Sequence, residues 1–251
     1  MDSGQTDLPG KVAELTARVA ELEAELASAY KELDAFAHSV SHDLRAPLRA
    51  VQGFTQIAIE ECGESVPESG RQYLSRVSAA ARKMSTLMDD LVKLSRIGRA
   101  ELSRNAVDAS ALARAVWRRL TASEPGREVQ LTVAEGLRVS ADRRLLELVF
   151  EHLLDNARKF TGRVPSPAIE VGSREIDGQR ALFVRDNGAG FEQAYVGRLF
   201  APFQRLHSDR DFPGSGIGLA IVHRIVRDHD GQIHVHDNQP RGTRFEIELP
   251  A

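Results

Sequence analysis

Apolar residues recur at alternating spacings of three and four along the N-terminal part of the chain. The seam fills nine positions without a break: Val12, Leu15, Val19, Leu22, Leu26, Ala29, Leu33, Phe36 and Val40. A narrow a/d seam with polar residues elsewhere is typical of a coiled coil, here of four heptads. Arg18 at a g position and Glu23 at an e position favour a parallel two-stranded partner. The alternative is a single amphipathic helix on a globular body, which would show a wider apolar stripe.

The helical pattern continues to residue 61, with Pro47 inside it, where we expect a kink. A short turn follows at 62–68, and a second seam then begins, formed by Leu74, Val77, Ala81, Met84, Met88 and Leu91. Two amphipathic helices joined by a short turn predict an antiparallel hairpin. One hairpin buries only one seam, so we expect two hairpins to pair as a four-helix bundle in a homodimer.

Beyond residue 105 the pattern mixes helices with strands. The predicted helices are 110–120, 143–160, 193–199 and 217–230; the predicted strands are 129–133, 168–176, 181–185, 233–236 and 244–249. This mixture predicts a two-layer α/β sandwich. The fold class is therefore α plus α/β, in three parts: a tail and coiled-coil helix (1–35), a helical hairpin (36–98) and an α/β domain (99–251).

Composition excludes several classes of protein. Lys and Arg number 33 against 36 for Asp and Glu, so no broad basic field favours nucleic-acid binding. Cys62 is the only cysteine, which excludes an intramolecular disulfide and a cysteine-based zinc site and fits a reducing compartment. No apolar run reaches the roughly 18 residues of a membrane span, and the N-terminus lacks the features of a signal peptide. We expect a soluble, cytoplasmic protein.

Three glycine clusters occur in the α/β part: DNGAG at 186–190, GSGIGLA at 214–220 and RGT at 241–243. The second leads directly into an apolar helix, whose free N–H groups and positive dipole end favour a phosphate. It is not a P-loop, because Gly218 is followed by Leu219 rather than by Lys-Ser/Thr. A dinucleotide site is also disfavoured, since no strand runs straight into the cluster.

The predicted helix 143–160 carries polar groups suited to a nucleotide. His152 and Asn156 are four residues apart and share a face, and Lys159 follows three residues later. An Asn oxygen suits magnesium, which takes few protein ligands beside phosphates and water, and Lys159 suits a phosphate. Asp186 has an acceptor-only carboxylate that suits an adenine amino group. The alternative is that Asn156 and Asp186 are only turn and cap residues.

His42 lies at heptad position c, off the seam and facing water. Neutral imidazole is a competent nucleophile at neutral pH. The adjacent Asp43 can hold one ring N–H, present the other nitrogen and stabilise the charge that develops on attack. The alternative is an ordinary surface histidine.

Five motifs follow one another along the chain: FAHSVSHDLRAPL, HLLDNARKFT, DNGAG, LFAPFQRL and GSGIGLAIV. In this order they resemble the H, N, first glycine, F and second glycine boxes of the sensor histidine kinases of two-component signalling. The resemblance covers residues 11–251 and is nearest to the phytochrome-type branch. It implies a dimeric helical bundle followed by an ATP-binding domain of the gyrase, heat-shock-chaperone and histidine-kinase type, with ATP and Mg²⁺ as cofactors.

The resemblance also implies a role for each matching residue. His42 would be the phosphoacceptor, Asp43 its orienting acid and Arg205 a lid residue that reaches the γ-phosphate. Asn156 would be the magnesium ligand. The remaining nucleotide-binding set is His152, Lys159, Asp186, Gly188, Gly190, Gly214, Gly216, Gly218, Leu219 and Thr243.

Three positions depart from the family pattern. His152 stands where an Asn is usual, and its imidazole can also meet a phosphate. Gly242 is the single glycine of the third glycine box, with Pro240 in the earlier place. Ala46 stands four residues after His42, where kinases that also dephosphorylate their partner have Thr or Asn to position a water. We therefore predict weak or absent phosphatase activity.

The favoured function is an autokinase that phosphorylates His42 and passes the phosphoryl group to an aspartate of a response-regulator receiver domain. An upstream sensor domain or partner would act through the coiled coil. One alternative is a catalytically silent, ATP-binding dimeric scaffold. Another is an ATPase of the wider fold with Glu151 as its catalytic carboxylate, which would leave the H box without a purpose.

Overall fold

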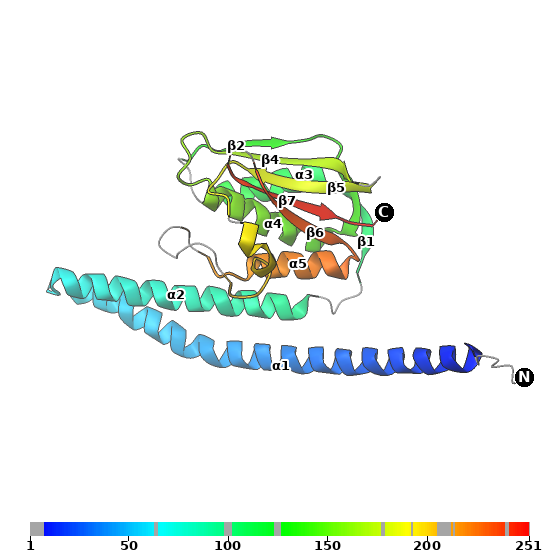
Figure 1. Cartoon of the computed structure of the whole chain (residues 1–251). Helices are drawn as coiled ribbons and strands as arrows, with labels where there is room; N and C mark the ends of the chain where they lie inside the picture. The colour runs from blue at the N-terminus through cyan, green and yellow to red at the C-terminus, as the bar shows by residue number, and fades with distance from the viewer. Residues whose placement is uncertain are drawn as a thin grey trace, which may run out of the picture.

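The computed structural model describes residues 8–62, 65–97, 102–122, 127–176, 179–191, 193–204, 212, 214–238 and 241–250. A long helical hairpin is followed by an α/β domain that lies along its second helix (Figure 1). The predicted combination of a helical hairpin and an α/β domain is confirmed. No described helix contains an apolar stretch long enough to cross a bilayer.

The hairpin consists of α1 (Leu8–Cys62) and α2 (Glu68–Arg96). α1 passes through Pro47 without ending, and Figure 1 shows that it bends along its second half. Leu48, Ala81 and Met88 form the small buried cluster between the helices. Arg45 Nη2 donates to Asp89 Oδ1 at 2.8 Å across the same interface, so the hairpin has a defined register.

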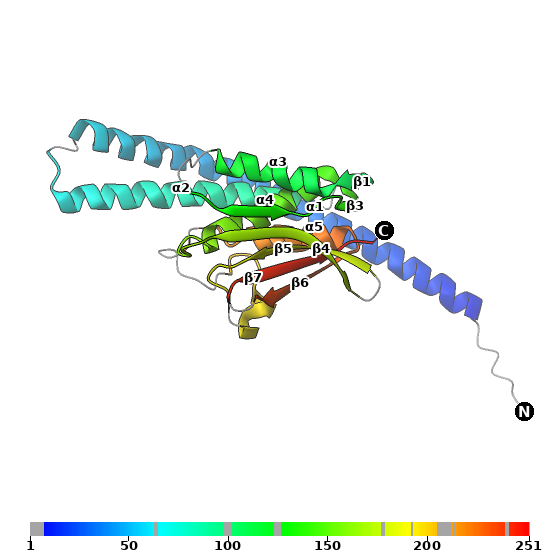
Figure 2. The ribbon, with the colours of Figure 1, turned by 90° about the horizontal axis from the view of Figure 1, so that it is seen from above.

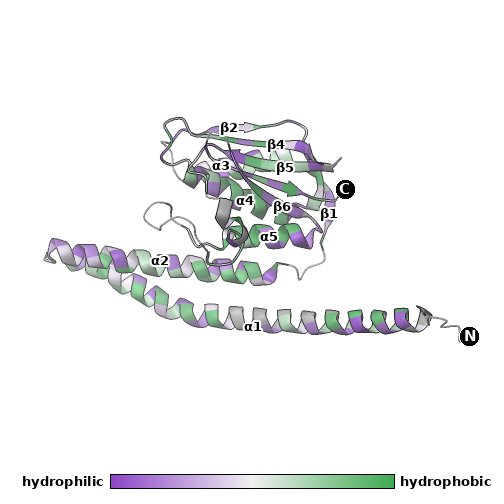
Figure 3. Cartoon of the chain, in the orientation of Figure 1, coloured by the Kyte–Doolittle hydropathy of each residue, from purple (hydrophilic) through white to green (hydrophobic). Residues whose placement is uncertain are grey.

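Much of the apolar surface of the hairpin remains uncovered in a single chain. Figure 3 shows apolar and polar residues alternating along α1. The predicted apolar seam of α2 divides into two faces of the helix. Ala81 and Met88 are buried against α1, whereas Val77 and Met84 are exposed. The exposed apolar side chains of the two helices are Val12, Leu15, Val19, Leu22, Leu44, Val51, Phe54, Ile57, Tyr73, Val77 and Met84. The side chains of Leu26, Leu33 and Phe36, also in the predicted seam, lie outside the described ones.

The α/β domain is built on a five-stranded sheet of order β2-β4-β5-β7-β6. Its strands are β2 (Gln130–Val133), β4 (Ala168–Ile176), β5 (Gln179–Asp186), β6 (Gln232–Asp237) and β7 (Thr243–Glu248). β2 runs parallel to β4, and the other pairs are antiparallel.

Three helices cover one face of this sheet: α3 (Ala109–Thr121), α4 (Arg143–Phe160) and α5 (Gly218–Asp228), as Figures 1 and 2 show. Their apolar faces meet alternate strand residues in one core. Its largest fully buried apolar side chains are Phe150, Leu112, Leu153, Leu154, Ile169, Leu182, Ile217, Ile221, Ile225 and Ile247. The predicted two-layer sandwich is therefore confirmed, and α4 has the predicted bounds.

Two details differ from the sequence prediction. β1 (Arg104–Asp108) and β3 (Arg138–Asp142) form an antiparallel ribbon that no strand pattern indicated. β1 buries only Val107, so pairing rather than its own periodicity makes it a strand. The predicted helix 193–199 is the 3₁₀ helix η1 (Gln193–Arg198), which is short and contains Gly197.

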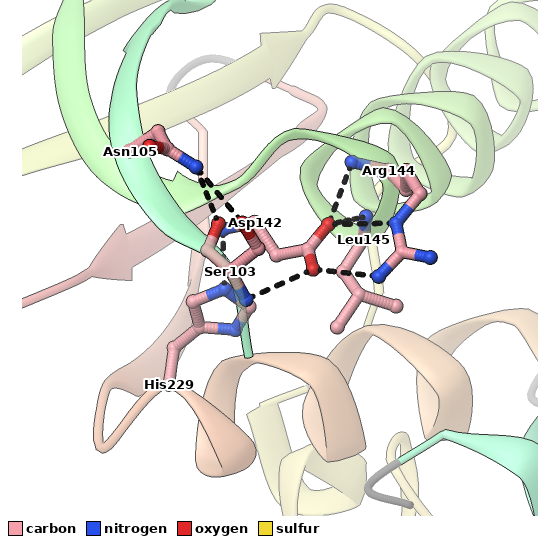
Figure 4. Close-up of polar contacts among 6 residues, drawn as sticks. All are labelled: Ser103, Asn105, Asp142, Arg144, Leu145 and His229. Atoms are coloured by element: carbon pink, nitrogen blue, oxygen red, sulfur yellow. Dashed lines mark hydrogen bonds and ion pairs between the residues drawn. The ribbon is translucent and has the colours of Figure 1, made fainter. Parts of the chain in front are cut away.

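A polar cluster joins the start of the α/β domain to the ends of two helices (Figure 4). Asp142 caps α4 by accepting from the backbone N–H of Arg144 at 2.9 Å, and its Oδ2 accepts from Ser103 N–H at 3.3 Å. His229, after α5, donates from Nδ1 to Ile225 O, so its Nε2 accepts the N–H of Asp142 at 3.0 Å. Hydrogen bonding by Arg144 lowers the pKa of Asp142 to about 2. The cluster therefore connects α4, α5 and the entry strand.

Replacement of His229 tests this cluster. His229→Ala should lower the free energy of unfolding by about 1–3 kcal/mol, because the buried N–H of Asp142 loses its acceptor. Urea unfolding followed by circular dichroism measures the change. His234→Ala, on the half-exposed side of β6, is the matched control and should change stability little. Equal losses in both variants would contradict the proposed role of His229.

Candidate functional site

His42 is displayed on the solvent face of α1. Its side chain is 78% exposed, and Nδ1 lies 3.2 Å from Asp43 Oδ1. With the Nδ1 proton donated to this carboxylate, Nε2 carries the lone pair and is the nitrogen available for attack. The Asp43 carboxylate is also placed to stabilise a positive charge that develops on the ring. The exposure and the pairing agree with the sequence expectation for both residues.

A cavity of about 320 Å³ opens beside α4, the start of α5 and the ends of β5 and β7. Most of the predicted nucleotide-binding residues line it: His152, Asn156, Lys159, Asp186, Gly190, Gly214, Gly216, Gly218, Leu219 and Thr243. Gly188 does not line the cavity but supports Asp186. His42 and Asp43 lie on the hairpin and are not among the lining residues. Arg205 lies outside the described residues.

Asp186 lies buried at one end of the cavity. Its Oδ1 accepts from the N–H groups of Gly188 at 2.7 Å and Thr243 at 3.3 Å, which leaves Oδ2 to accept from a ligand. Burial raises the pKa of this carboxyl to about 6, although the two backbone hydrogen bonds oppose the shift. Such a carboxylate suits the exocyclic amino group of adenine.

Gly242 allows the chain to pass close to Asp186. Its φ is +123°, and a Cβ at this position would lie 2.1 Å from the carbonyl oxygen of Asp186. The same oxygen accepts from Asn238 Nδ2 at 2.8 Å. Only glycine fits this backbone conformation and this approach. The single remaining glycine of the third glycine box therefore lies where a side chain would displace Asp186.

Asn156 and Lys159 present polar groups of α4 to the cavity. Lys159 forms an ion pair with Asp155 in the same helix, so its ammonium would have to turn toward a phosphate. Asn156 offers one amide oxygen. No group of three or more His, Cys, Asp or Glu that could hold a metal occurs among the described residues. This donor set fits a magnesium ion whose remaining ligands are nucleotide phosphates and water.

His152 of α4 packs against the start of α5. Its Nδ1 would lie 3.0 Å from a Cβ at Gly218, so the ring packs closely on the first turn of this helix. The Nε2 atom is buried without a hydrogen-bond partner in the part of the chain that is described. Burial lowers the pKa of His152. The N-cap residue Ile217 gives α5 no side-chain cap, so the helix N-terminus beside His152 leaves free N–H groups that suit an anion.

α2 contributes Thr86, Asp90 and Lys93 to the wall of the same cavity. Sequence reasoning missed these residues. The period of α2 predicted a seam toward α1, but nothing in the pattern indicated that another side of the helix faces this cavity.

Residues 32–100 match the family model described as the His Kinase A (phospho-acceptor) domain. Residues 141–251 match the model described as the Histidine kinase-, DNA gyrase B-, and HSP90-like ATPase. A phosphoacceptor hairpin with an attached ATPase-like domain defines a transmitter core. The chain belongs to the sensor histidine kinases, of which it carries this core.

Similar proteins agree with this assignment. The methanogenesis regulatory histidine kinase FilI of Methanothrix harundinacea is 34% identical over 88% of the chain. Cyanobacterial phytochrome B of Nostoc sp. is 32% identical over 87%. The chain spans only 25% and 29% of the lengths of these two relatives.

Solved structures show the same fold. Full-length ShkA in complex with AMPPNP has a TM-score of 0.61 and 27% identity, covering 87% of this chain and 46% of that chain. The histidine kinase AdeS of Acinetobacter baumannii has a TM-score of 0.56 and 24% identity, covering 83% of this chain and 96% of that chain.

Proposed function

We propose that the chain is an ATP-dependent protein histidine kinase that phosphorylates its own His42. The observation that supports this most directly is the pairing of an exposed His42 with Asp43 on a hairpin that adjoins a cavity lined by the predicted nucleotide-binding residues. His42 Nε2 attacks the γ-phosphorus of ATP. An N–P bond forms as the bond to the β,γ-bridging oxygen breaks, and ADP leaves. Asp43 retains the Nδ1 proton by hydrogen bonding and balances the charge of the ring.

The two ends of the cavity bind the two ends of the nucleotide. Asp186 accepts from the adenine amino group, while the start of α5, His152 and Lys159 bind the phosphates. Asn156 would hold Mg²⁺, which neutralises phosphate charge during transfer. Gly214, Gly216 and Gly218 belong to a lid segment, and Arg205 would reach the γ-phosphate. The AMPPNP complex of the similar protein ShkA supports ATP as the nucleotide.

The phosphoryl group then passes to an aspartate of a response-regulator receiver domain. The His42 face of α1 and the first part of α2 would dock this partner. No feature of the chain favours nucleic acid as a partner. The location is proposed to be cytoplasmic, where the lone thiol of Cys62 fits a reducing compartment.

The active form is proposed to be a homodimer. The exposed apolar positions of α1 and α2, among them Val51, Phe54 and Val77, leave a second seam for another hairpin. The exposed Val12 and Leu15 suit a parallel coiled coil that would link an upstream sensor domain or partner to the bundle. The division of the chain at residues 35 and 98 stays a prediction.

An ATPase function is disfavoured by the surroundings of Glu151. This carboxylate lines the cavity but is bound by Arg119 Nη2 at 3.2 Å, and the same guanidinium binds Glu147 at 2.6 Å. A carboxylate held in this way is a poor base for activating water.

Incubation with Mg²⁺ and γ-labelled ATP tests the proposed function. A phosphohistidine bond is stable in base and labile in acid, so the protein should carry label with that stability. Label that survives acid would contradict the proposal. AMPPNP binding without any label would support the silent scaffold instead.

Ala46 predicts a further property of the kinase. The side chain at this exposed position offers no hydrogen bond to a water near His42. Dephosphorylation of a phosphorylated receiver domain should therefore be slow, and Ala46→Thr should raise its rate about tenfold or more, the range of a positioned water. Ala46→Val is the control, because Val has nearly the shape of Thr but no hydroxyl group to hold a water. Fast dephosphorylation by the parent that Ala46→Thr leaves unchanged would show that the prediction is wrong.

A further inference from the structure

The nucleotide cavity is closed on one side by the hairpin itself. Leu87, Leu94 and Ile97, from α2 and its end, pack against the core of the α/β domain. Between them, Asp90 and Lys93 reach the cavity wall. Figure 1 shows α5 above α2, with α1 on the far side of α2. The cavity therefore faces α2, whereas His42 lies on α1.

Asp90 is a carboxylate in an unusual position. The residue is only 7% exposed. Its ion-pair partner is Lys93 on the same helix, at 3.7 Å and half exposed, so the pair is weak. Among the described residues Asp90 has no other ion-pair partner. A buried acid with so little compensation is costly unless another group of positive charge faces it.

The group with partial positive charge on the same cavity is the uncapped start of α5, whose free N–H groups point into it. Burial lowers the pKa of the adjacent His152 and favours its neutral form. Asp90 acts on the pKa of His152 more strongly than any other charged group, ahead of Glu151, Lys93 and Asp155. Asp186, at the adenine end, shows no such influence from Asp90. Asp90 also lines the cavity, and α2 packs on α5. The Asp90 carboxylate therefore lies toward the end of the cavity formed by His152 and the start of α5, where we place the phosphates.

We propose that Asp90 occupies the position of a nucleotide phosphate group while α2 is docked against the cavity. A triphosphate and Asp90 then compete for the same end of the cavity, since two anions in a partly buried site repel each other. Binding of ATP thus releases the α/β domain from α2, and the released domain can reach a histidine on α1. The functional meaning of this inference rests on the proposed kinase function, whereas its test does not depend on kinase activity.

The test compares nucleotide affinities of the whole chain with those of Asp90→Asn. The variant should bind Mg-AMPPNP about tenfold more tightly, ADP slightly more tightly and adenosine equally well, because only the phosphates meet Asp90. Asp89→Asn removes the same charge one residue away, where the carboxylate pairs with Arg45, and should leave all three affinities unchanged. Weaker AMPPNP binding by Asp90→Asn, an unchanged affinity, or equal gains for adenosine would overturn the proposal.

Domain release provides a second measurement. Small-angle scattering should show an increase in the radius of gyration of the parent when Mg-AMPPNP is added, and a smaller increase for Asp90→Asn. No increase in the parent would overturn the proposal. Neither measurement requires phosphoryl transfer. If the affinities and the radius of gyration change as expected but His42 is not phosphorylated, only the proposed kinase function is refuted. If His42 is phosphorylated but the expected changes in affinity and radius of gyration are absent, only the proposed role of Asp90 is refuted.

Discussion

His42→Gln protein should acquire no acid-labile phosphate from Mg-ATP, while its affinity for AMPPNP stays unchanged. The amide nitrogen of Gln is not nucleophilic, and His42 is not among the residues that line the nucleotide cavity. The measurement is labelling by γ-labelled ATP, followed by acid treatment. His38→Gln, one turn earlier on α1, is the matched control and should be labelled like the parent. Full labelling of His42→Gln would place the phosphoacceptor elsewhere.

The same variant reports which subunit supplies the phosphoryl group. Asn156→Ala should lose transfer, because it lacks the proposed magnesium ligand, but it retains His42. If one subunit phosphorylates the other, mixed dimers of the two variants should recover label on the Asn156→Ala chain. If transfer stays within a subunit, the mixture should remain unlabelled.

Asp186→Asn should lower ATP affinity by about 10- to 100-fold, the equivalent of roughly 1–3 kcal/mol for a mispaired buried polar group. The N–H groups of Gly188 and Thr243 both donate to Oδ1. The amide oxygen of the Asn must therefore take this place, and its NH₂ group then faces the amino group of adenine. Two hydrogen-bond donors then face each other, and the binding of ATP is weakened.

Inosine triphosphate is the control nucleotide for this variant. Its 6-oxo group is an acceptor and suits the introduced NH₂, so Asp186→Asn should bind it more tightly than the parent does. Competition of both nucleotides against a fluorescent ATP analogue measures the preference. If the variant binds both nucleotides more weakly by the same factor, the site is generally damaged and the hydrogen bond is not reversed.

The raised pKa of Asp186 adds a pH dependence. Burial brings this pKa to about 6, so the carboxylate is ionised at pH 7.5 and increasingly protonated below pH 6. Because Oδ1 accepts two N–H groups, the added proton belongs on Oδ2, where adenine needs an acceptor. ATP affinity should therefore fall as the pH drops through 6. Asp186→Asn should not show this loss, since its amide does not titrate.

The sequence predicts features that depend on neighbouring residues along the chain, and it misses features that depend on contacts between distant segments. α4 has the predicted bounds because its apolar period is strong and Asp142 caps its start. Most of the predicted nucleotide-binding residues of the α/β domain converge on one cavity, because strand ends and helix starts meet at one edge of the sheet. β1 was missed, since a strand with one buried residue has no period of its own.

The sequence by itself determined the hairpin and the helices and strands of the main sheet, because these depend on local period. It also predicted that Asp186 and Asn156 share one site, and both line the cavity. Only the tertiary structure decided that Gly242 lies against the carbonyl of Asp186 and that His152 packs on the start of α5. It alone also brought Asp90 of α2 to the wall of this cavity. These contacts join residues far apart along the chain, and no local pattern encodes how one packed surface is placed against another.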